Sequence, residues 1–248
     1  MKKVILITGG SRGIGSATAY RAAEQGYSIC VTYRQQRDRA NSVIEAIKRG
    51  GGSAIALQAD IASEPDVINL FHTLDQQLGS ITALVNNVGI LERQLRVDEM
   101  TGDRLTRIFA TNVIGSFICA REAVKRMSTK HGGTGGAIVN VSSVASRVGS
   151  PNEYVDYAAS KGAIDTMTIG LAKEVAAEGI RVNAVRPGFI DTDIHADGGE
   201  PGRIERLKAL IPMKRGGQAI EVAHAVMWLL SDQASYTTGS FIDMAGGI

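Results

Sequence analysis

Cysteine is scarce in this chain, and its scarcity argues against two classes of protein. The 248 residues contain two cysteines, Cys30 and Cys119, without a short spacing between them and without a cluster of histidines nearby. Disulfide frameworks and zinc sites both need several such residues at close intervals, so we expect neither a disulfide scaffold nor a metal site. This cysteine usage is typical of a reducing compartment, and we expect a cytoplasmic protein.

Long hydrophobic runs are also missing. The apolar run from Val4 to Ile7 ends after four residues at Thr8, whereas the apolar part of a secretory signal is about 7–15 residues long. The run from Ala225 to Leu230 is far shorter than the roughly 20 residues that cross a bilayer. The sequence therefore predicts neither a signal peptide nor a membrane partner.

An excess of charge of one sign is lacking as well. The 27 basic and 25 acidic residues leave a net charge of +2, which is not the charge of a protein that binds a nucleic-acid backbone. With 44% hydrophobic and 21% charged residues, the composition is that of an ordinary globular domain. We expect one domain over residues 1–248, with no nucleic acid among its partners.

Short apolar segments alternate with segments of helical periodicity along the whole chain. Strands are predicted at 4–7, 28–33, 54–57, 81–85, 137–141, 180–185 and 240–243, with helices between them that include 103–127 and 157–177. This alternation predicts an α/β fold, a Rossmann-type doubly wound parallel sheet of about seven strands with helices on both faces. The glycine-rich, weakly periodic segment 188–217 is predicted to form a mobile substrate lid.

A glycine-rich turn joins the first predicted strand to the first predicted helix. It contains Gly9, Gly13 and Gly15 in the sequence Thr-Gly-Gly-Ser-Arg-Gly-Ile-Gly. Such glycines allow the backbone to approach a pyrophosphate at the positive N-terminus of a helix. The spacing differs from the usual G-x-G-x-x-G, and tight strand–helix packing is the alternative interpretation. The position between a strand and a helix favours a dinucleotide-binding turn.

The end of the second predicted strand bears on the choice of cofactor. NAD-specific sites usually carry an acidic residue there, which holds the ribose 2′-hydroxyl. Here Arg34 follows Tyr33, and no acid appears until Asp38. Arg34 and Arg12 would suit a 2′-phosphate, because a guanidinium binds phosphate oxygens in bidentate fashion. NADP(H) is therefore favoured over NAD(H), with solvated surface arginines as the alternative.

Tyr157 and Lys161 are four residues apart in a predicted helix, and so lie one turn apart on the same face. A free phenol has a pKa of about 10, and a neighbouring ammonium is expected to lower it toward neutral pH. Such a pair also occurs by chance in many helices. Ser142 and Ser143 end a predicted strand nearby in sequence, and strand alternation would let only one of them meet a substrate.

Taken in order, the motifs resemble those of the short-chain dehydrogenase/reductase family across the whole chain. Within that family the chain is similar to bacterial members of the glucose-1-dehydrogenase-like and 3-oxoacyl-carrier-protein-reductase-like types. The motifs that carry the resemblance are the glycine turn 8–15, Asn86-Asn87-Val88-Gly89, Asn112, Ser143, Tyr157 with Lys161, and Pro187-Gly188.

The resemblance implies a catalytic set of Asn112, Ser143, Tyr157 and Lys161. Tyr157 would be the general acid in reduction and the general base in oxidation, and Ser143 would hold the substrate oxygen. Lys161 would bind the nicotinamide ribose and depress the pKa of Tyr157. Asn112 would hold a water for proton relay, although a side chain bonded back to its own helix is the alternative.

The resemblance also implies the cofactor contacts and the assembly. Asp60 would face the adenine or, alternatively, cap the next loop. A homotetramer is implied, and Val113, Phe117, Met167 and Leu171 are apolar positions compatible with its interface. The residues implied to contact the cofactor are Gly9, Ser11, Arg12, Gly13, Ile14, Gly15, Arg34, Asp60, Ile61, Asn86, Gly89, Tyr157, Lys161, Pro187, Gly188, Ile190 and Thr192.

The function that follows is an NADP(H)-dependent oxidoreductase, of the class that interconverts an alcohol and a carbonyl by hydride transfer to or from nicotinamide. Two alternatives are a non-catalytic regulator that senses NADP(H) and an NAD-dependent dehydrogenase of a sugar. A sugar epimerase is disfavoured, because the chain is short and lacks a separate substrate domain. Sugars, ketoesters, acyl thioesters and steroid-like compounds all stay open as substrates.

Overall fold

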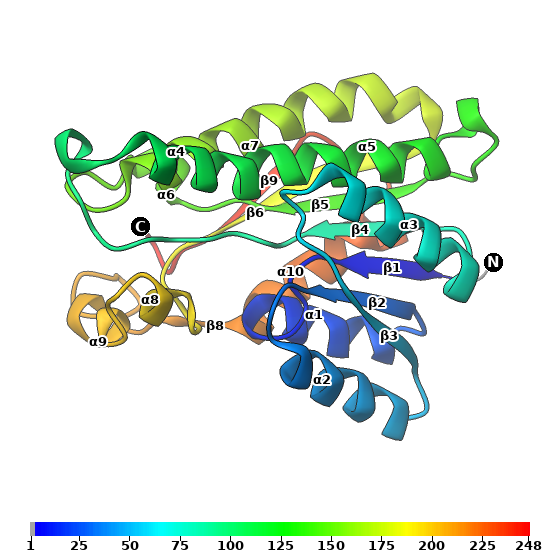
Figure 1. The fold of residues 1–248 in the computed structure, drawn as a ribbon, viewed down its shortest axis with the longest axis horizontal. Coiled ribbons are helices and arrows are strands. Elements are labelled where there is room, and N and C mark those ends of the chain that lie inside the picture. Colours follow the sequence, from blue (N-terminus) through cyan, green and yellow to red (C-terminus); the bar gives the residue numbers. More distant parts are fainter. Residues whose placement is uncertain (1–2) are drawn as a thin grey trace.

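The fold is a parallel sheet between two layers of helices, as Figure 1 shows for a computed structural model that describes residues 3–248. Seven strands of that part of the chain form one sheet in the order β3-β2-β1-β4-β5-β6-β9, and every neighbouring pair is parallel. The strand order reverses between β1 and β4, which is the switch point of a doubly wound sheet. The predicted Rossmann-type fold is confirmed.

The seven strands lie close to their predicted positions. All four residues of β1 are buried, as expected for a central strand covered on both faces. The largest difference from prediction is in β4, which begins two residues later, at Ala83, and ends one residue later, at Asn86. The bounds are β1 Val4–Ile7, β2 Ser28–Tyr33, β3 Ser53–Gln58, β4 Ala83–Asn86, β5 Gly136–Val141, β6 Ile180–Pro187 and β9 Phe241–Met244.

The helices divide into two layers with separate apolar cores. Helices α1 (Gly13–Glu24), α2 (Arg37–Arg49) and α10 (Ala219–Leu230) pack on one face of the sheet. Helices α3 (Glu64–Leu78), α5 (Gly115–Met127) and α7 (Val155–Val175) pack on the other. Both faces of the sheet are therefore covered, which leaves the carboxyl ends of the strands as the natural place for a site.

The helix predicted over 103–127 is interrupted. It consists of α4 (Gly102–Phe109), one π-helical turn (Ala110–Ile114) and α5. Within this turn the Asn112 carbonyl accepts a hydrogen bond from the Ser116 hydroxyl, at 3.0 Å. A π turn inserts one extra residue into a helix and is often found at functional sites. The uninterrupted helix was wrong because hydrophobic periodicity does not register such an insertion.

The segment 188–217 has more regular structure than its composition suggests. It contains β7 (Ile190–Asp191), α8 (Ile194–Asp197) and α9 (Arg203–Leu207), and β7 pairs with β8 (Gly217–Gln218). We call residues 188–217 the lid, and its mobility stays a prediction. The remaining short helices are α6 (Ala145–Val148) and the 3₁₀ turns Val97–Glu99, Thr129–His131, Ala176–Glu178 and Asp232–Ala234.

Two classes of feature are absent from residues 3–248. No helix there has both the length and the apolarity that a bilayer crossing requires. In the same residues, no three potential metal-ligating side chains gather in one place.

Candidate active site

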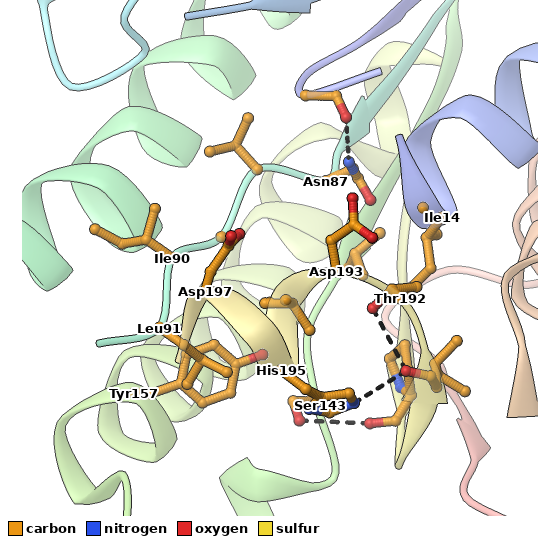
Figure 2. A pocket seen from close by; sticks show the side chains of 18 of the residues that line it. Ile14, Asn87, Ile90, Leu91, Ser143, Tyr157, Thr192, Asp193, His195 and Asp197 are labelled. Carbon is orange, nitrogen blue, oxygen red and sulfur yellow. Dashed lines mark hydrogen bonds between the residues drawn. The ribbon is translucent and has the colours of Figure 1, made fainter. Parts of the chain in front are cut away.

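A cleft of about 750 Å³ opens at the carboxyl ends of the strands, below the lid (Figure 2). Its volume is in the range of small-molecule and cofactor sites. The glycine turn, the ends of β2 and β3, α7 and the lid all contribute to its walls. The predicted site residues that line it are Gly9, Ser11, Arg12, Gly13, Ile14, Arg34, Asp60, Ile61, Gly89, Ser143, Tyr157, Lys161, Pro187, Gly188, Ile190 and Thr192.

Three predicted residues, Gly15, Asn86 and Asn112, are not part of the described lining of the cleft. The Asn86 side chain is buried behind the wall, where its Nδ2 donates to Asn140 Oδ1 at 3.0 Å and to the Ser116 carbonyl at 3.2 Å. The contact between Asn86 and a cofactor stays a prediction. Its neighbour Asn87 lies in the lining instead.

The glycine turn combines two uses of glycine. Gly9 and Gly13 have φ angles of 65° and 55°, which side chains disfavour. A Cβ on Gly15 would lie 2.4 Å from the Gly9 carbonyl oxygen, so Gly15 serves close strand–helix packing. Asn87 Nδ2 fixes the turn by donating to the carbonyl of Thr8 at 2.9 Å. The turn thus holds the positive N-terminus of α1 toward the cleft.

Tyr157 and Lys161 lie close together, but their titration differs from the prediction. Burial raises the pKa of Tyr157 to about 12, and a hydrogen bond with Ser143 acts in the opposite direction. Burial lowers the pKa of Lys161 to about 8, and its Nζ donates to the Val141 carbonyl at 2.7 Å. The expected lowering of the tyrosine pKa is wrong, because low-dielectric surroundings disfavour the charged form of each group.

The two serines at the end of β5 have different roles. The Ser142 hydroxyl donates to Asp165 at 2.6 Å, and Asp165 also accepts from Arg186 Nε at 3.0 Å. Ser143 lies beside the Tyr157 phenol, and its hydroxyl accepts from the Ala145 amide at 3.1 Å. Both serines line the cleft, but the Ser142 hydroxyl is engaged with Asp165 and only Ser143 lies beside the phenol. The contact between Ser143 and a substrate stays a prediction.

Asn112 connects the loop after β4 to the tyrosine helix. Its Oδ1 accepts from the Ile90 amide at 2.8 Å, and its Nδ2 donates to the Ile90 carbonyl and to Ser160 Oγ, both at 3.1 Å. Ser160 in turn donates to the Tyr157 carbonyl at 2.7 Å. The alternative of a side chain bonded back to its own helix is therefore wrong. The proposed water relay stays a prediction.

A buried ion pair supports the first turn of α7. Arg104 Nε donates to Asp156 Oδ2 at 2.7 Å, and the two side chains are 4% and 0% exposed. Asp156 Oδ1 accepts from the Tyr157 amide at 2.9 Å, and Arg104 Nη1 donates to the Arg93 carbonyl at 2.6 Å. Sequence reasoning missed this pair. An acid directly before Tyr157 was the one available signal, and nothing in the sequence identifies Arg104 as its partner.

The predicted phosphate-binding arginines face carboxylates in this structure. Arg12 pairs with Asp193 at 3.3 Å and also with Asp197, and both acids belong to the lid. Arg39 pairs with Asp193 at 2.5 Å. The hydrogen bonds that Arg39 and Arg12 donate to Asp193 hold the pKa of this aspartate below its usual value, although partial burial acts in the opposite direction. The lid is thereby tied to α1 and α2.

The second predicted arginine is similarly engaged. Arg34 Nη1 lies 3.8 Å from Asp60 Oδ2. The other oxygen of Asp60 accepts from the Ala62 amide at 3.0 Å, which is the loop-capping alternative considered for this residue. Asp60 therefore lines the cleft and caps a loop at once.

The lid contributes one buried histidine, His195, to the lining of the cleft. His195 Nε2 lies 3.0 Å from the Ile190 carbonyl, and burial lowers the pKa of His195. The ring is therefore neutral, and because a carbonyl only accepts, Nε2 carries the proton. The lining of the cleft also includes the apolar residues Ile90, Leu91, Val144, Val148, Phe189 and Ile194 and the charged residues Glu153 and Arg203.

The sequence matches known oxidoreductases over nearly all of its length. A family model described as enoyl-(acyl carrier protein) reductase matches residues 9–248. The uncharacterized oxidoreductase YgfF of Escherichia coli K12 is 62% identical over 244 residues, covering 98% of this chain and 99% of the relative. The 3-oxoacyl-acyl-carrier-protein reductase FabG of Staphylococcus aureus Mu50 is 38% identical over 250 residues, covering 100% and 98%.

Solved structures give the same result. A short-chain dehydrogenase/reductase variant from Serratia marcescens superimposes with a TM-score of 0.91 at 33% identity, covering 99% of this chain and 97% of that one. A short-chain dehydrogenase from Burkholderia cenocepacia, solved in complex with NADP, superimposes with a TM-score of 0.90 at 32% identity and the same coverage.

Proposed function

Because this chain belongs to the short-chain dehydrogenase/reductase family of oxidoreductases, we propose that it interconverts an alcohol and a carbonyl with NADP(H). The observation that carries this proposal is one continuous cleft with different chemistry at its two ends. One end holds the glycine turn and two arginines, and the other holds Ser143, Tyr157 and Lys161. A dinucleotide would reach from the first group to the second.

The residues of the cleft fit a nicotinamide dinucleotide. The glycine turn leaves the N-terminus of α1 open to a pyrophosphate, and Arg12 and Arg34, which also line the cleft, would bind a 2′-phosphate. A Cβ on Gly89 would lie 3.3 Å from Lys161 Nζ, so this glycine keeps space beside the ammonium. Lys161 would hold the ribose hydroxyls there. When bound, the nicotinamide supplies or accepts the hydride.

The chain's own residues would supply the proton transfer. In reduction, the Tyr157 phenol would donate its proton to the carbonyl oxygen while Ser143 hydrogen-bonds the same oxygen. The phenol of Tyr157 is protonated at neutral pH, so it carries the proton that carbonyl reduction requires. For oxidation the phenolate would have to form first.

The proposed reaction is tested by following NADPH absorbance with a panel of ketoesters, acyl thioesters, sugars and steroid-like ketones. The wild-type protein is expected to consume NADPH with at least one of them. Tyr157→Phe keeps the ring and removes the acid, so kcat is expected to fall by about 10²–10⁴-fold. A wild-type protein that binds NADPH tightly but reduces none of these carbonyls would support the regulator instead.

We further propose a cytoplasmic homotetramer. The cytoplasmic location is supported by the two buried free thiols. The assembly is supported by Ile114 and Phe117, which are 52% and 50% exposed on the π turn and α5. Met167, expected among the interface positions, is only 5% exposed and packs in the core. Light scattering after size exclusion tests the assembly, and a monomer would contradict it.

A further inference from the structure

We propose that Asp193 and Asp197 of the lid compete with the cofactor's 2′-phosphate for Arg12, while Arg39 pairs with Asp193 and holds it there. We call these two aspartates the carboxylate strap. In this structure the strap occupies Arg12, so a cofactor that carries a 2′-phosphate must displace it. A cofactor without that phosphate leaves the strap in place. The inference deepens the proposed function and rests on its use of a nicotinamide dinucleotide.

The first support is the position of the strap. Asp193, Asp197 and Arg12 all line the cleft, and Figure 2 shows both aspartates projecting from the segment around α8. The ion pairs join residues far apart in the chain, since Arg12 is on the glycine turn and Arg39 is on α2. The strap therefore crosses from the lid to the elements that would surround the adenosine end of a cofactor.

The second support is the charge balance of this region. Three guanidinium groups face three carboxylates, because Arg34 also lies 3.8 Å from Asp60. An incoming 2′-phosphate does not meet free arginines there. The phosphate meets arginines whose charge is already neutralised by carboxylates, and these carboxylates repel it. Bidentate binding to Arg12 therefore requires that Arg12 first leaves Asp193 and Asp197.

The third support is that these pairs are exchangeable. The side chains of Arg12, Asp193 and Asp197 are 38%, 50% and 46% exposed. Ion pairs with this much solvent contact are individually weak and are screened by salt. A phosphate can therefore replace them, which it could not do at a buried pair.

Two consequences follow from this competition. Removing the acids while keeping the arginines should strengthen binding of the phosphorylated cofactor selectively. Binding of a 2′-phosphate should also loosen α8 from the glycine turn, because Arg12 cannot serve both partners. The lid would then respond to the phosphate even in the absence of a nicotinamide ring.

The binding experiment uses Asp193→Asn, Asp197→Asn and the double variant, with NADPH and NADH as probes in fluorescence titrations. We expect the double variant to bind NADPH about tenfold more tightly, as the loss of two to three weak competing pairs suggests. NADH affinity should change by less than about twofold, since that cofactor does not use the arginines. High salt should reduce the difference between the two cofactors.

Glu64→Gln is the matched control. Glu64 pairs with Arg121 at 2.7 Å, and the two side chains are 50% and 42% exposed, so the pair resembles the strap pairs but lies outside the cleft lining described. The Glu64→Gln variant should bind NADPH and NADH with the same affinities as the wild type. Thermal denaturation of each variant establishes that it is folded before its binding is interpreted.

A second measurement is independent of any nicotinamide. Adenosine 2′,5′-bisphosphate carries the 2′-phosphate, and ADP lacks it. In the wild type, the first should speed amide hydrogen exchange across α8 and the second should not. Faster exchange with both ligands, or with neither, would count against the strap.

The outcomes separate the strap from the proposed function. Equal changes for NADPH and NADH in the double variant, no change, or weaker NADPH binding would each overturn the strap. A wild type that binds NADPH without reducing any carbonyl would refute the enzyme and leave the strap supported by the titrations. A wild type selective for NADH, with NADPH binding gained in the double variant, would support the strap and revise the cofactor.

Discussion

The first turn of α7 and the mouth of the cleft both hold an arginine against aspartate, yet the two regions are built differently. Arg104 and Asp156 are 4% and 0% exposed, and their remaining polar atoms bond to backbone groups. Arg12 and its two acids are between 38% and 50% exposed. The same pairing chemistry gives a fixed support at one place and an exchangeable contact at the other.

Solvent accounts for the difference. Breaking a buried pair leaves one charge without water or partner, which is costly, whereas an exposed pair exchanges its partner for water at little cost. A buried pair is therefore suited to holding the Tyr157 amide in place. An exposed pair is suited to a lid whose contacts have to change.

Asp156→Ala tests most directly whether the buried Arg104–Asp156 pair is a fixed support. The substitution leaves Arg104 buried and unpaired, so the free energy of unfolding should fall by about 3–5 kcal/mol. Urea denaturation monitored by circular dichroism measures the loss. A loss below about 1 kcal/mol, the size expected for an exposed pair, would show that water reaches Arg104.

Lys161 sharpens the comparison, because it is a buried cation whose hydrogen-bond partner is a carbonyl and not a carboxylate. Its pKa is lowered from 10.5 to about 8, so between these values the unfolded chain binds more protons than the folded protein. The free energy of unfolding should rise with pH across this window, by about 3 kcal/mol at most, and the full cost is present below it. Urea denaturation of the wild type and of Lys161→Met at several pH values across this window measures the rise in the free energy of unfolding. A similar rise in the variant would assign the effect to another group.

Replacing both partners of the buried pair tests whether the pair positions Tyr157 independently of its contribution to the free energy of unfolding. In Arg104→Met with Asp156→Leu, apolar side chains of similar size fill the space, and stability should stay within about 2 kcal/mol of the wild type or increase. The Tyr157 amide loses its acceptor, so kcat for carbonyl reduction should fall by about tenfold while NADPH affinity stays constant. Steady-state kinetics and fluorescence titration measure the two. Unchanged kcat would show that the pair does not position Tyr157.

The smallest effect on stability is expected at the strap. Asp193→Asn and Asp197→Asn together should change the free energy of unfolding by less than about 1 kcal/mol, because the pairs are exposed. Urea denaturation at low and high salt measures it. A loss as large as that of Asp156→Ala would mean that the strap is a structural element and not an exchangeable one.

Local sequence patterns predicted the fold well, because each depends on neighbours in the chain. In α3 the apolar residues recur at helical spacing and are buried, and Ser63 caps the helix by accepting from the Asp66 amide. The four buried residues of β1 likewise follow from their apolar run. The glycine turn and the Tyr157–Lys161 pair were found for the same reason, since their spacing is local.

What the sequence did not predict depends on residues that are distant in the chain or on burial. Asp193 and Arg12 are 181 positions apart, and no local pattern pairs them. The direction of the Tyr157 pKa shift was wrong because proximity to Lys161 was visible in the sequence and the depth of burial was not. The π turn at Asn112 escaped because one inserted residue hardly alters an apolar stripe.

That inserted residue has a consequence for anyone who shortens the chain. An α-helix turns by about 100° per residue, so deleting one residue between Gly115 and Cys119, inside α5, would rotate every later side chain of that helix by about that angle and carry Cys119 out of the core. The π turn already contains one extra residue. Deleting Val113 there would convert it to regular α-helix and leave Cys119 buried and Phe117 exposed, so a one-residue deletion is tolerated at the π turn and not within α5.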